Sequence, residues 1–147
     1  MIALLTTLLF MGTTATVTVL GGDGGVKAAS VLDGKWQAVE AELAGKKFPP
    51  QAARGIQLTI DGENYLVTTD EGEDRGTTRV MPDAKPSAID ITGTMGPNKG
   101  KTFLAIYKLD GDTLVVCYDL GGKSRPKEFK TEPKSTLFLV TYRKLKS

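Results

Sequence analysis

The sequence has no histidine, and its only cysteine is Cys117. Without histidine, the chain cannot form a His-based catalytic triad, a His-ligated metal site or an imidazole acid–base pair. A single cysteine cannot form an intrachain disulfide or a Cys-rich zinc site. Cys117 lies in the apolar run TLVVCY, where a free cysteine usually behaves as a small buried hydrophobe. We therefore expect no catalytic site, no metal site and no cofactor.

A strong excess of charge of either sign is also missing. The 19 basic and 17 acidic residues give a net charge of +2. No basic stripe with interleaved aromatic residues is present, and such a stripe is the usual signature of a nucleic-acid-binding surface. We expect no nucleic-acid partner. The length of 147 residues fits one domain with a short additional segment.

Charged side chains are absent from residues 1–22. The apolar run from Ile2 to Met11 has the length of the core of a secretory signal, although no Lys or Arg precedes it. An uncleaved anchor is the alternative, since about 20 uncharged residues can span a bilayer. We expect a signal peptide or N-terminal anchor over 1–22, a linker over 23–31 and a domain over 32–147. This arrangement predicts export to the periplasm, the envelope or the exterior, with membrane contact only through an uncleaved N-terminal segment.

From about Leu32 onward, apolar residues recur with period two, which is typical of strands. The run IQLTI, 56–60, places its three apolar residues on one face. The turn DGEN, 61–64, follows it, and an Asp-Gly pair between two strand-like runs is the strongest short signal for a β-hairpin. A second such pair lies in DGD, 110–112. The pattern predicts an all-β domain.

The first predicted strand begins near Lys35 and the last spans 135–145, with about eight strands in all. Most connections are short, so the strands should be antiparallel. The exceptions are a short helical turn near 49–55 and a long irregular segment over 121–135. We predict an eight-stranded antiparallel up-and-down barrel. A two-sheet sandwich is the alternative, and it would need longer crossing connections.

The first predicted strand starts with Gly34-Lys35-Trp36, which resembles the Gly-x-Trp signature of lipocalins. The resemblance implies that Trp36 plugs one end of the barrel and that a basic side chain of the last strand packs over its ring. Arg143, in TYRKL, lies where such a residue is expected. A guanidinium on an indole face contributes about 0.5–2 kcal/mol. Trp36 and Arg143 are therefore the predicted pair that closes the barrel.

A longer set of motifs covers nearly the whole region after the linker. It is similar to an uncharacterised lipocalin-like domain family that is abundant in planctomycetes. The matching residues are Pro86, Ile89, Asp90, Gly96, Pro97, Gly100, Lys101, Thr102, Ile106, Tyr107, Gly111, Asp112, Leu114, Cys117, Arg125, Pro126 and Phe129. The resemblance implies a lipocalin-like fold and frequent export, and it implies no established activity.

The stretch GTMGPNKGKT, 93–102, is close to a nucleotide-binding P-loop but does not match it. The motif needs a glycine where Met95 stands. It must also lead into a helix whose N-terminus faces the phosphates, whereas the following TFLAIYKL is a predicted strand. We predict a glycine-rich turn between the fifth and sixth strands, at the rim of the barrel.

Acidic residues raise two questions. The cluster DEGED, 70–74, is most simply a solvated loop, since it has no EF-hand spacing. In the first strand, Glu40 has the same parity as Trp36, so strict alternation would turn both into the barrel. Either a bulge exchanges the two faces, or Glu40 is a polar group at the open end of a ligand site.

Aromatic residues on the predicted strands either pack in a filled core or line a cavity, because an eight-stranded barrel is just wide enough for either. The candidate ligand-binding residues are Tyr65, Phe103, Tyr107, Tyr118 and Glu40. We expect an exported lipocalin-like domain that binds a small apolar or amphipathic ligand in its barrel. The alternative is a filled barrel that acts as a structural or protein-interaction domain of the cell envelope. We do not expect an enzyme.

Overall fold

The computed structural model describes residues 31–146. The predicted signal peptide or anchor over 1–22 lies outside the described residues, as does the predicted linker except for Val31. The described elements are β1 (Gly34–Leu43), β2 (Lys46–Lys47), α3 (Pro50–Arg54), β3 (Gln57–Asp61), β4 (Asn64–Thr69), β5 (Gly72–Met81), β6 (Ala88–Met95), β7 (Thr102–Asp110), β8 (Thr113–Asp119) and β9 (Leu137–Lys144). No helix within this part of the chain is long and apolar enough to cross a membrane.

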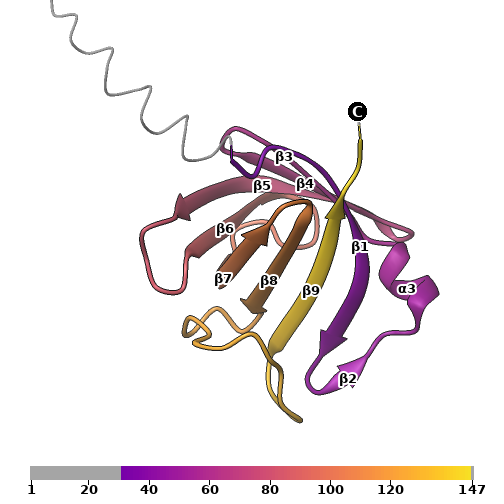
Figure 1. Ribbon diagram of the computed structural model, residues 1–147, viewed down its shortest axis with the longest axis vertical. Helices are drawn as coiled ribbons and strands as arrows, with labels where there is room; N and C mark the ends of the chain where they lie inside the picture. The colour runs from indigo at the N-terminus through magenta and orange to yellow at the C-terminus, as the bar shows by residue number, and fades with distance from the viewer. Residues whose placement is uncertain (1–30, 147) are drawn as a thin grey trace, which may run out of the picture.

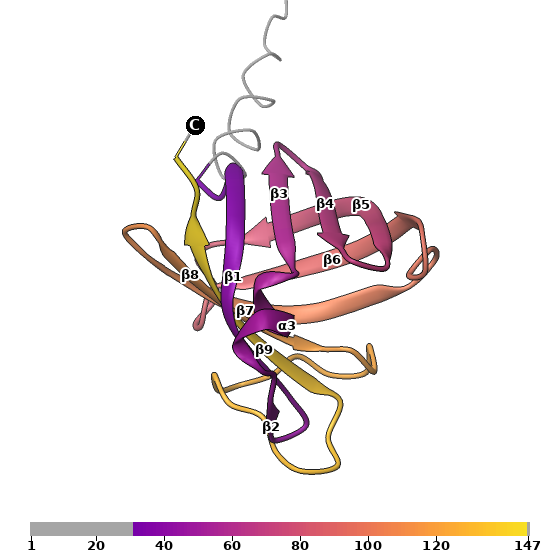
Figure 2. The same cartoon turned by 90° about the vertical axis from the view of Figure 1, so that its right-hand side faces the viewer.

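Eight of the strands form a closed antiparallel barrel (Figure 1). From β3 to β9, each strand pairs with the next one along the chain, and β1 pairs with both β3 and β9. The two-residue strand β2 only extends the end of β1. The view at 90° shows the strands wound around one interior (Figure 2). The predicted all-β up-and-down barrel is therefore confirmed, and the sandwich is excluded.

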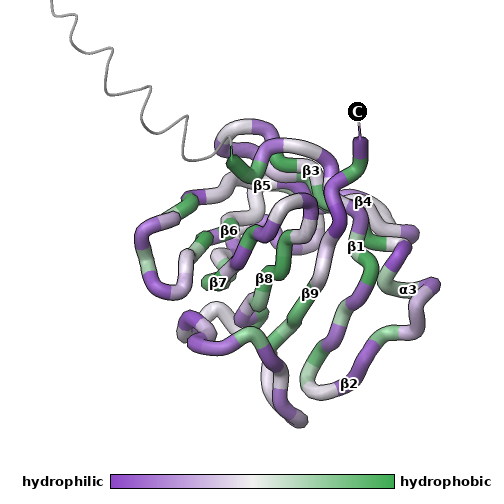
Figure 3. Tube along the Cα trace, in the orientation of Figure 1, coloured by the Kyte–Doolittle hydropathy of each residue, from purple (hydrophilic) through white to green (hydrophobic). Residues whose placement is uncertain are grey.

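The alternation of side chains follows the period that the sequence predicted. On β8, Leu114 and Val116 face the interior and are 1% and 3% exposed. Cys117, the next residue along β8, faces the outside of the barrel but is completely buried. The tube of β8 is accordingly hydrophobic along most of its length (Figure 3). The outer face of β8 must therefore also be covered.

The strap, which we define as residues 120–136, covers that outer face. Asp119 anchors its beginning, because the carboxylate accepts hydrogen bonds from three strap N–H groups and from the Thr136 hydroxyl. Arg125 forms a 2.6 Å ion pair with Asp90 on β6. The Cys117 Sγ lies 3.7 Å from the Lys130 carbonyl oxygen. The predicted irregular segment is thus an ordered layer outside the sheet.

Trp36 lies at the end of the barrel where β1 begins, which we call the closed end. Its side chain is 1% exposed, and its indole N–H donates a 2.9 Å hydrogen bond to the carbonyl of Leu32. This closed end carries the β3–β4, β5–β6 and β7–β8 turns, since successive strands of the barrel alternate in direction. The opposite end, which we call the mouth, carries the β1–β3 connection, the β4–β5 turn, the β6–β7 loop and the strap.

The cation over Trp36 is Lys144, and the prediction of Arg143 for this role is wrong. The Lys144 ammonium lies 5.5 Å from the centre of the Trp36 ring. On β9, the buried Tyr142 and Lys144 share one side of the strand, while Arg143 points to the other side and is exposed. Gly34 leaves space for the lysine, since a Cβ at Gly34 would lie 2.7 Å from the Lys144 Cε.

A β-bulge in β1 places Glu40 outside the barrel. The register with β9 shifts between Ala38 and Glu40, so Ala38 and Ala41 are both buried while Glu40 is exposed. The extra residue exchanges the two faces of the strand. Of the two alternatives left open by the sequence, the bulge is correct, and Glu40 is not a residue of the interior.

Candidate ligand-binding cavity

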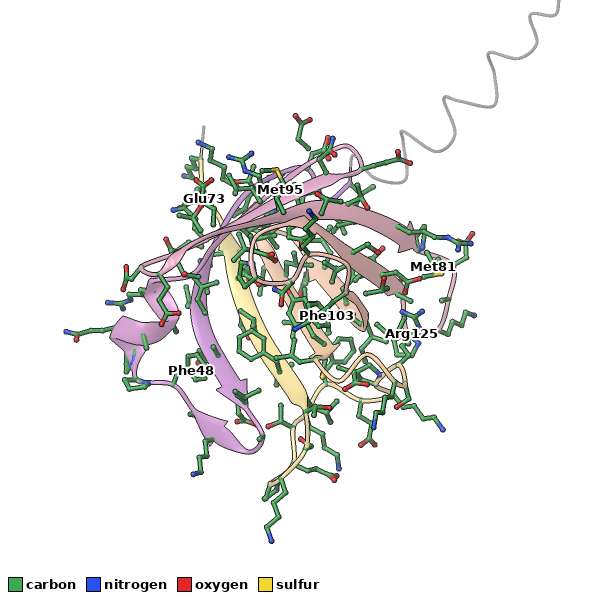
Figure 4. All side chains as sticks on the ribbon, turned by 180° about the vertical axis from the view of Figure 1, so that it is seen from behind. Phe48, Glu73, Met81, Met95, Phe103 and Arg125 are labelled. Carbon is green, nitrogen blue, oxygen red and sulfur yellow. The ribbon has the colours of Figure 1, made fainter. Side chains whose placement is uncertain are left out.

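The barrel encloses a cavity of about 480 Å³. Small-molecule sites in proteins usually have volumes of about 300–1,000 Å³. Its walls are mainly apolar and aromatic, and Phe103 points into it from β7 (Figure 4). The aliphatic part of the lining comprises Leu32, Ile56, Leu58, Ile60, Val67, Ile89, Ile91, Leu114, Val116 and Leu120. The barrel is therefore hollow rather than filled.

The cavity extends from the closed end to the mouth. Leu32 lines it at the closed end, next to Trp36. At the mouth, the lining includes Pro97 of the β6–β7 loop and Leu120 at the start of the strap, and both are exposed. The β4–β5 turn, 69–74, completes this rim. A ligand would therefore enter at the mouth.

Four of the five predicted ligand-binding residues line the cavity. Tyr65, Phe103 and Tyr107 are 5%, 8% and 6% exposed, and Tyr118 lies beside them on the lining. The fifth, Glu40, lies outside the barrel. The interpretation of the aromatic residues as cavity-lining is confirmed, and their contact with a ligand remains a prediction.

Two tyrosine hydroxyls in the cavity wall form a hydrogen bond with each other. The hydroxyls of Tyr118 and Tyr142 are 2.8 Å apart, on neighbouring strands β8 and β9. Burial raises the pKa of Tyr142 to about 12 and raises the pKa of Tyr118 well above its usual value. Burial also raises the pKa of Tyr107. This part of the wall is therefore uncharged at neutral pH and needs no polar partner from a ligand.

Asp74 links two elements of the rim. Its Oδ2 accepts a 2.9 Å hydrogen bond from the Tyr65 hydroxyl and a 3.1 Å hydrogen bond from the amide of Asn98. Burial, reinforced by the bond to Asp74, raises the pKa of Tyr65. The other carboxylate oxygen, Oδ1, is buried and has no hydrogen-bond partner among the described residues. Asp74 thus connects β5 with the β6–β7 loop and keeps one unsatisfied oxygen.

The glycine-rich stretch 93–102 forms that β6–β7 loop. The Gly93 N–H donates to the Lys101 carbonyl, and the Gly100 N–H donates to the Gly93 carbonyl, both at 2.9 Å. A Cβ at Gly93 would lie 2.1 Å from the Asn98 carbonyl oxygen, so the loop packs directly on this glycine. The loop leads into strand β7, as predicted, and a P-loop would need a helix there.

All charged residues in the cavity lining are acidic: Glu71, Glu73 and Asp74. The sequence predicted a solvated acidic loop here, whereas Glu73 and Asp74 belong to strand β5. Lys99 and Lys101 of the β6–β7 loop are exposed and lie outside the lining. Within residues 31–146, no three His, Cys, Asp or Glu side chains are grouped so that they could bind a metal ion.

Comparisons with known proteins give one distant structural likeness. No protein-family model matches the chain, and no curated protein matches it. Among solved structures, the chain is similar to a DUF4847 family protein from Bacteroides vulgatus ATCC 8482, with a TM-score of 0.47 and 14% sequence identity. The match covers 82% of this chain and 96% of that one. The fold of the present chain follows from its own strand pairing.

Proposed function

We propose that this protein is an exported binding protein that takes up a small apolar or amphipathic ligand in its barrel. The observation that supports the proposal is the cavity of about 480 Å³ behind the mouth. A filled barrel would leave only the outer surface for function, as a structural or interaction domain.

The chemistry of the wall supports an apolar ligand body. Most lining side chains are aliphatic or aromatic, and each Å² of apolar surface removed from water contributes roughly 25 cal/mol. Two hydroxyl groups of the wall, those of Tyr118 and Tyr142, already form a hydrogen bond with each other. A ligand that enters the barrel therefore loses little by bringing no polar group to this region.

The test is binding of a neutral fluorescent probe, N-phenylnaphthylamine, to the purified protein. Val116→Phe adds a ring on the cavity side of β8, where Val116 is buried. It should weaken probe binding at least about tenfold, because the ring occupies space that the probe needs. Val115→Phe is the matched control, since the neighbouring Val115 is not part of the lining.

Two outcomes would contradict the proposal. The first is a folded wild-type protein that does not bind the neutral probe, which would favour a function of the outer surface. The second is equal probe binding by Val116→Phe and Val115→Phe, which would place the probe elsewhere. Native mass spectrometry of protein purified from its own host would then show whether a small molecule accompanies the chain.

Export is the second part of the proposal. It is supported by the uncharged segment 1–22 with its apolar run from Ile2 to Met11. Fractionation of the host, combined with the mass of the mature N-terminus, tests it. Full-length protein confined to the cytoplasmic fraction would contradict export.

A further inference from the structure

We infer that the ligand carries a positive charge at one end: an apolar body inside the barrel and an amine or quaternary ammonium group at the mouth. This inference rests on the proposed binding function and specifies its ligand class. It follows from the charged side chains that line the cavity, which are all acidic.

The lining contains three ionisable acids and no lysine or arginine. Glu71, Glu73 and Asp74 are contributed by the β4–β5 turn and the start of β5. All three lie at the mouth, and the wall behind them is apolar. A group bound at the mouth therefore meets negative side chains, while the rest of the ligand meets hydrocarbon. This is the distribution that complements an amphipathic cation.

Cations of the protein itself neutralise this rim only in part. Arg75 pairs with Glu73 at 2.9 Å, but the two side chains are 51% and 50% exposed, so water screens the pair. Neither Glu71 nor Asp74 forms an ion pair with a described lysine or arginine. Glu71 and Asp74 therefore remain without an ion-pair partner among the described residues, and Lys99 and Lys101 of the β6–β7 loop lie outside the lining.

Asp74 strengthens the argument because its carboxylate is incompletely satisfied. Both of its hydrogen bonds go to Oδ2, from Tyr65 and Asn98. Oδ1 is buried without a donor among the described residues. A buried carboxylate oxygen without a donor costs free energy, and a nearby positive charge offsets that cost. A cationic group of the ligand at the mouth would supply such a charge through space, since Oδ1 itself is covered by protein atoms.

The same features disfavour an anionic ligand. A fatty acid would bring its carboxylate to the mouth, next to Glu71 and Asp74, or would bury it among apolar side chains. Repulsion between like charges opposes the first position, and desolvation of the carboxylate opposes the second. A site for such a ligand would need an arginine or lysine on the lining, and the described lining has neither.

The experiment compares three probes that each have a ten-carbon chain and different head groups: decyltrimethylammonium, decanol and decanoate. Each is titrated below its micelle concentration against the wild-type protein loaded with N-phenylnaphthylamine, at low and at high salt. We expect the cation to displace the dye at concentrations at least about tenfold lower than the anion, with a smaller difference at high salt.

Variants locate the effect at the mouth. The double change Glu71→Gln and Glu73→Gln should reduce the ratio of the cation's affinity to that of decanol several-fold, because it removes two negative charges from the rim. Glu63→Gln is the control and removes one charge far from the mouth, since Glu63 is exposed in the β3–β4 turn at the closed end. It changes the net charge without changing the mouth, so the ratio should stay at the wild-type value.

The outcomes separate the inference from the proposed function. If decanol displaces the dye and the cation is no better than the anion, the inference is wrong and the binding function stands. If the Glu63 variant lowers the ratio as much as the double variant, net charge rather than the rim is responsible, and the inference is again wrong. If the dye itself does not bind to the wild-type protein, the proposed function fails, and the inference that rests on it fails as well.

Discussion

The ammonium of Lys144 lies 5.5 Å from the centre of the Trp36 ring, and the two residues are direct cross-strand partners on β9 and β1. In this contact, the Lys144 side chain covers the indole ring of Trp36 at the closed end of the barrel. Lysine can cover apolar surface in this way while its ammonium stays in water. The indole N–H of Trp36 also donates a 2.9 Å hydrogen bond to the carbonyl of Leu32, whose side chain lines the cavity.

Lys144→Ala should lower the stability of the barrel by about 0.5–1 kcal/mol, the usual size of a cation–π contact at an exposed site. Arg143→Ala is the control, because Arg143 lies next to Lys144 in sequence but points away from Trp36. Urea unfolding followed by Trp36 fluorescence measures both. Equal losses in the two variants would contradict the assignment of the contact to Lys144.

Gly76 is required by close packing rather than by a special backbone angle. A Cβ at this position would lie 1.9 Å from the Thr92 carbonyl oxygen and 2.6 Å from Cε1 of Tyr65. Gly76→Ala should therefore cost about 1–3 kcal/mol and displace the Tyr65 ring from the cavity wall. Gly55→Ala is the control, because its nearest neighbour would be 3.3 Å away.

Thermal unfolding and binding of the neutral naphthylamine dye test this expectation together. Gly76→Ala should lower the melting temperature and weaken dye binding, whereas Gly55→Ala should change both only slightly. If Gly76→Ala had the wild-type melting temperature, β6 could move away from residue 76 at Thr92 with little loss of stability. That result would contradict the requirement for glycine at this position.

The barrel could be predicted from the sequence because its strands are apolar on alternate residues and are joined by Asp-Gly turns. Strand β3 is an example, since Leu58 and Ile60 are buried as their spacing predicted. Strand β5 is the exception. It begins at Gly72, within the acidic stretch 70–74 that the sequence predicted to be a solvated loop. Its first half, GEDRG, has no apolar residue, so the period-two signal is missing where the strand forms the acidic rim.

The two wrong site predictions, Glu40 and Arg143, both concern the face of a strand. A bulge cannot be located from one sequence, so the outward position of Glu40 could not be settled in advance. The alternation of side chains on β9, in contrast, could have identified Lys144 in place of Arg143. If Tyr142 points inward, Lys144 shares its side of the strand and Arg143 does not. The volume of the cavity could not be predicted either, because it depends on how far the aromatic side chains from several strands fill the interior.

Asp119 should make the protein less stable in acid. Burial alone would raise the pKa of its carboxyl, but hydrogen bonds from the Ser124 N–H, the Thr136 hydroxyl and the N–H groups of Gly121 and Lys123 outweigh burial and lower it. A pKa that is lower in the folded state stabilises the protein above the unfolded value, which is about 4. That contribution is lost as the pH falls through the folded value.

Asp119→Asn should cost about 1–3 kcal/mol at neutral pH, because an amide nitrogen then faces donors that need an acceptor. Its stability should also fall less than that of the wild type between neutral pH and acid pH. Urea unfolding at a series of pH values measures both effects. Asp112→Asn, in the exposed β7–β8 turn, is the control. Parallel pH curves for the wild type and Asp119→Asn would contradict the role of this carboxylate.

Arg125 should keep the strap closed over the only thiol of the chain. It pairs with Asp90 at 2.6 Å and donates a 2.9 Å hydrogen bond to the Ala105 carbonyl. Cys117 lies completely buried beneath the strap, and burial raises the pKa of its thiol. Arg125→Ala should release part of the strap, so a thiol reagent should label Cys117 faster in this variant than in the wild type.

Labelling under native conditions with a chromogenic disulfide tests this, because the chain has a single cysteine. Lys127→Ala is the control, since Lys127 is exposed on the same strap. We expect a rate increase of about tenfold or more for Arg125→Ala, the factor that corresponds to a local loss of 1.4 kcal/mol. A rate unchanged by Arg125→Ala would show that other contacts, such as those of Asp119, suffice to close the strap.

The four tyrosines of the chain should resist ionisation while the barrel is folded. Burial raises the pKa of each: to about 12 for Tyr142, and above the usual value for Tyr65, Tyr107 and Tyr118. In the unfolded chain, tyrosine ionises near pH 10. A pKa that is higher in the folded state contributes stability below pH 10, and this stability is lost as the pH rises through the folded values.

Alkaline titration should therefore show phenolate absorbance appearing together with the loss of near-ultraviolet circular dichroism, in one transition above pH 10. In concentrated denaturant, the same four groups should ionise near pH 10 without a cooperative step. Tyr142→Phe should weaken this alkaline resistance, because the Tyr118 hydroxyl then loses its 2.8 Å partner inside the cavity wall. The prediction is contradicted if two or more tyrosines ionise near pH 10 while the circular dichroism is unchanged. That result would show that water reaches these rings in the folded barrel and that burial does not raise their pKa values.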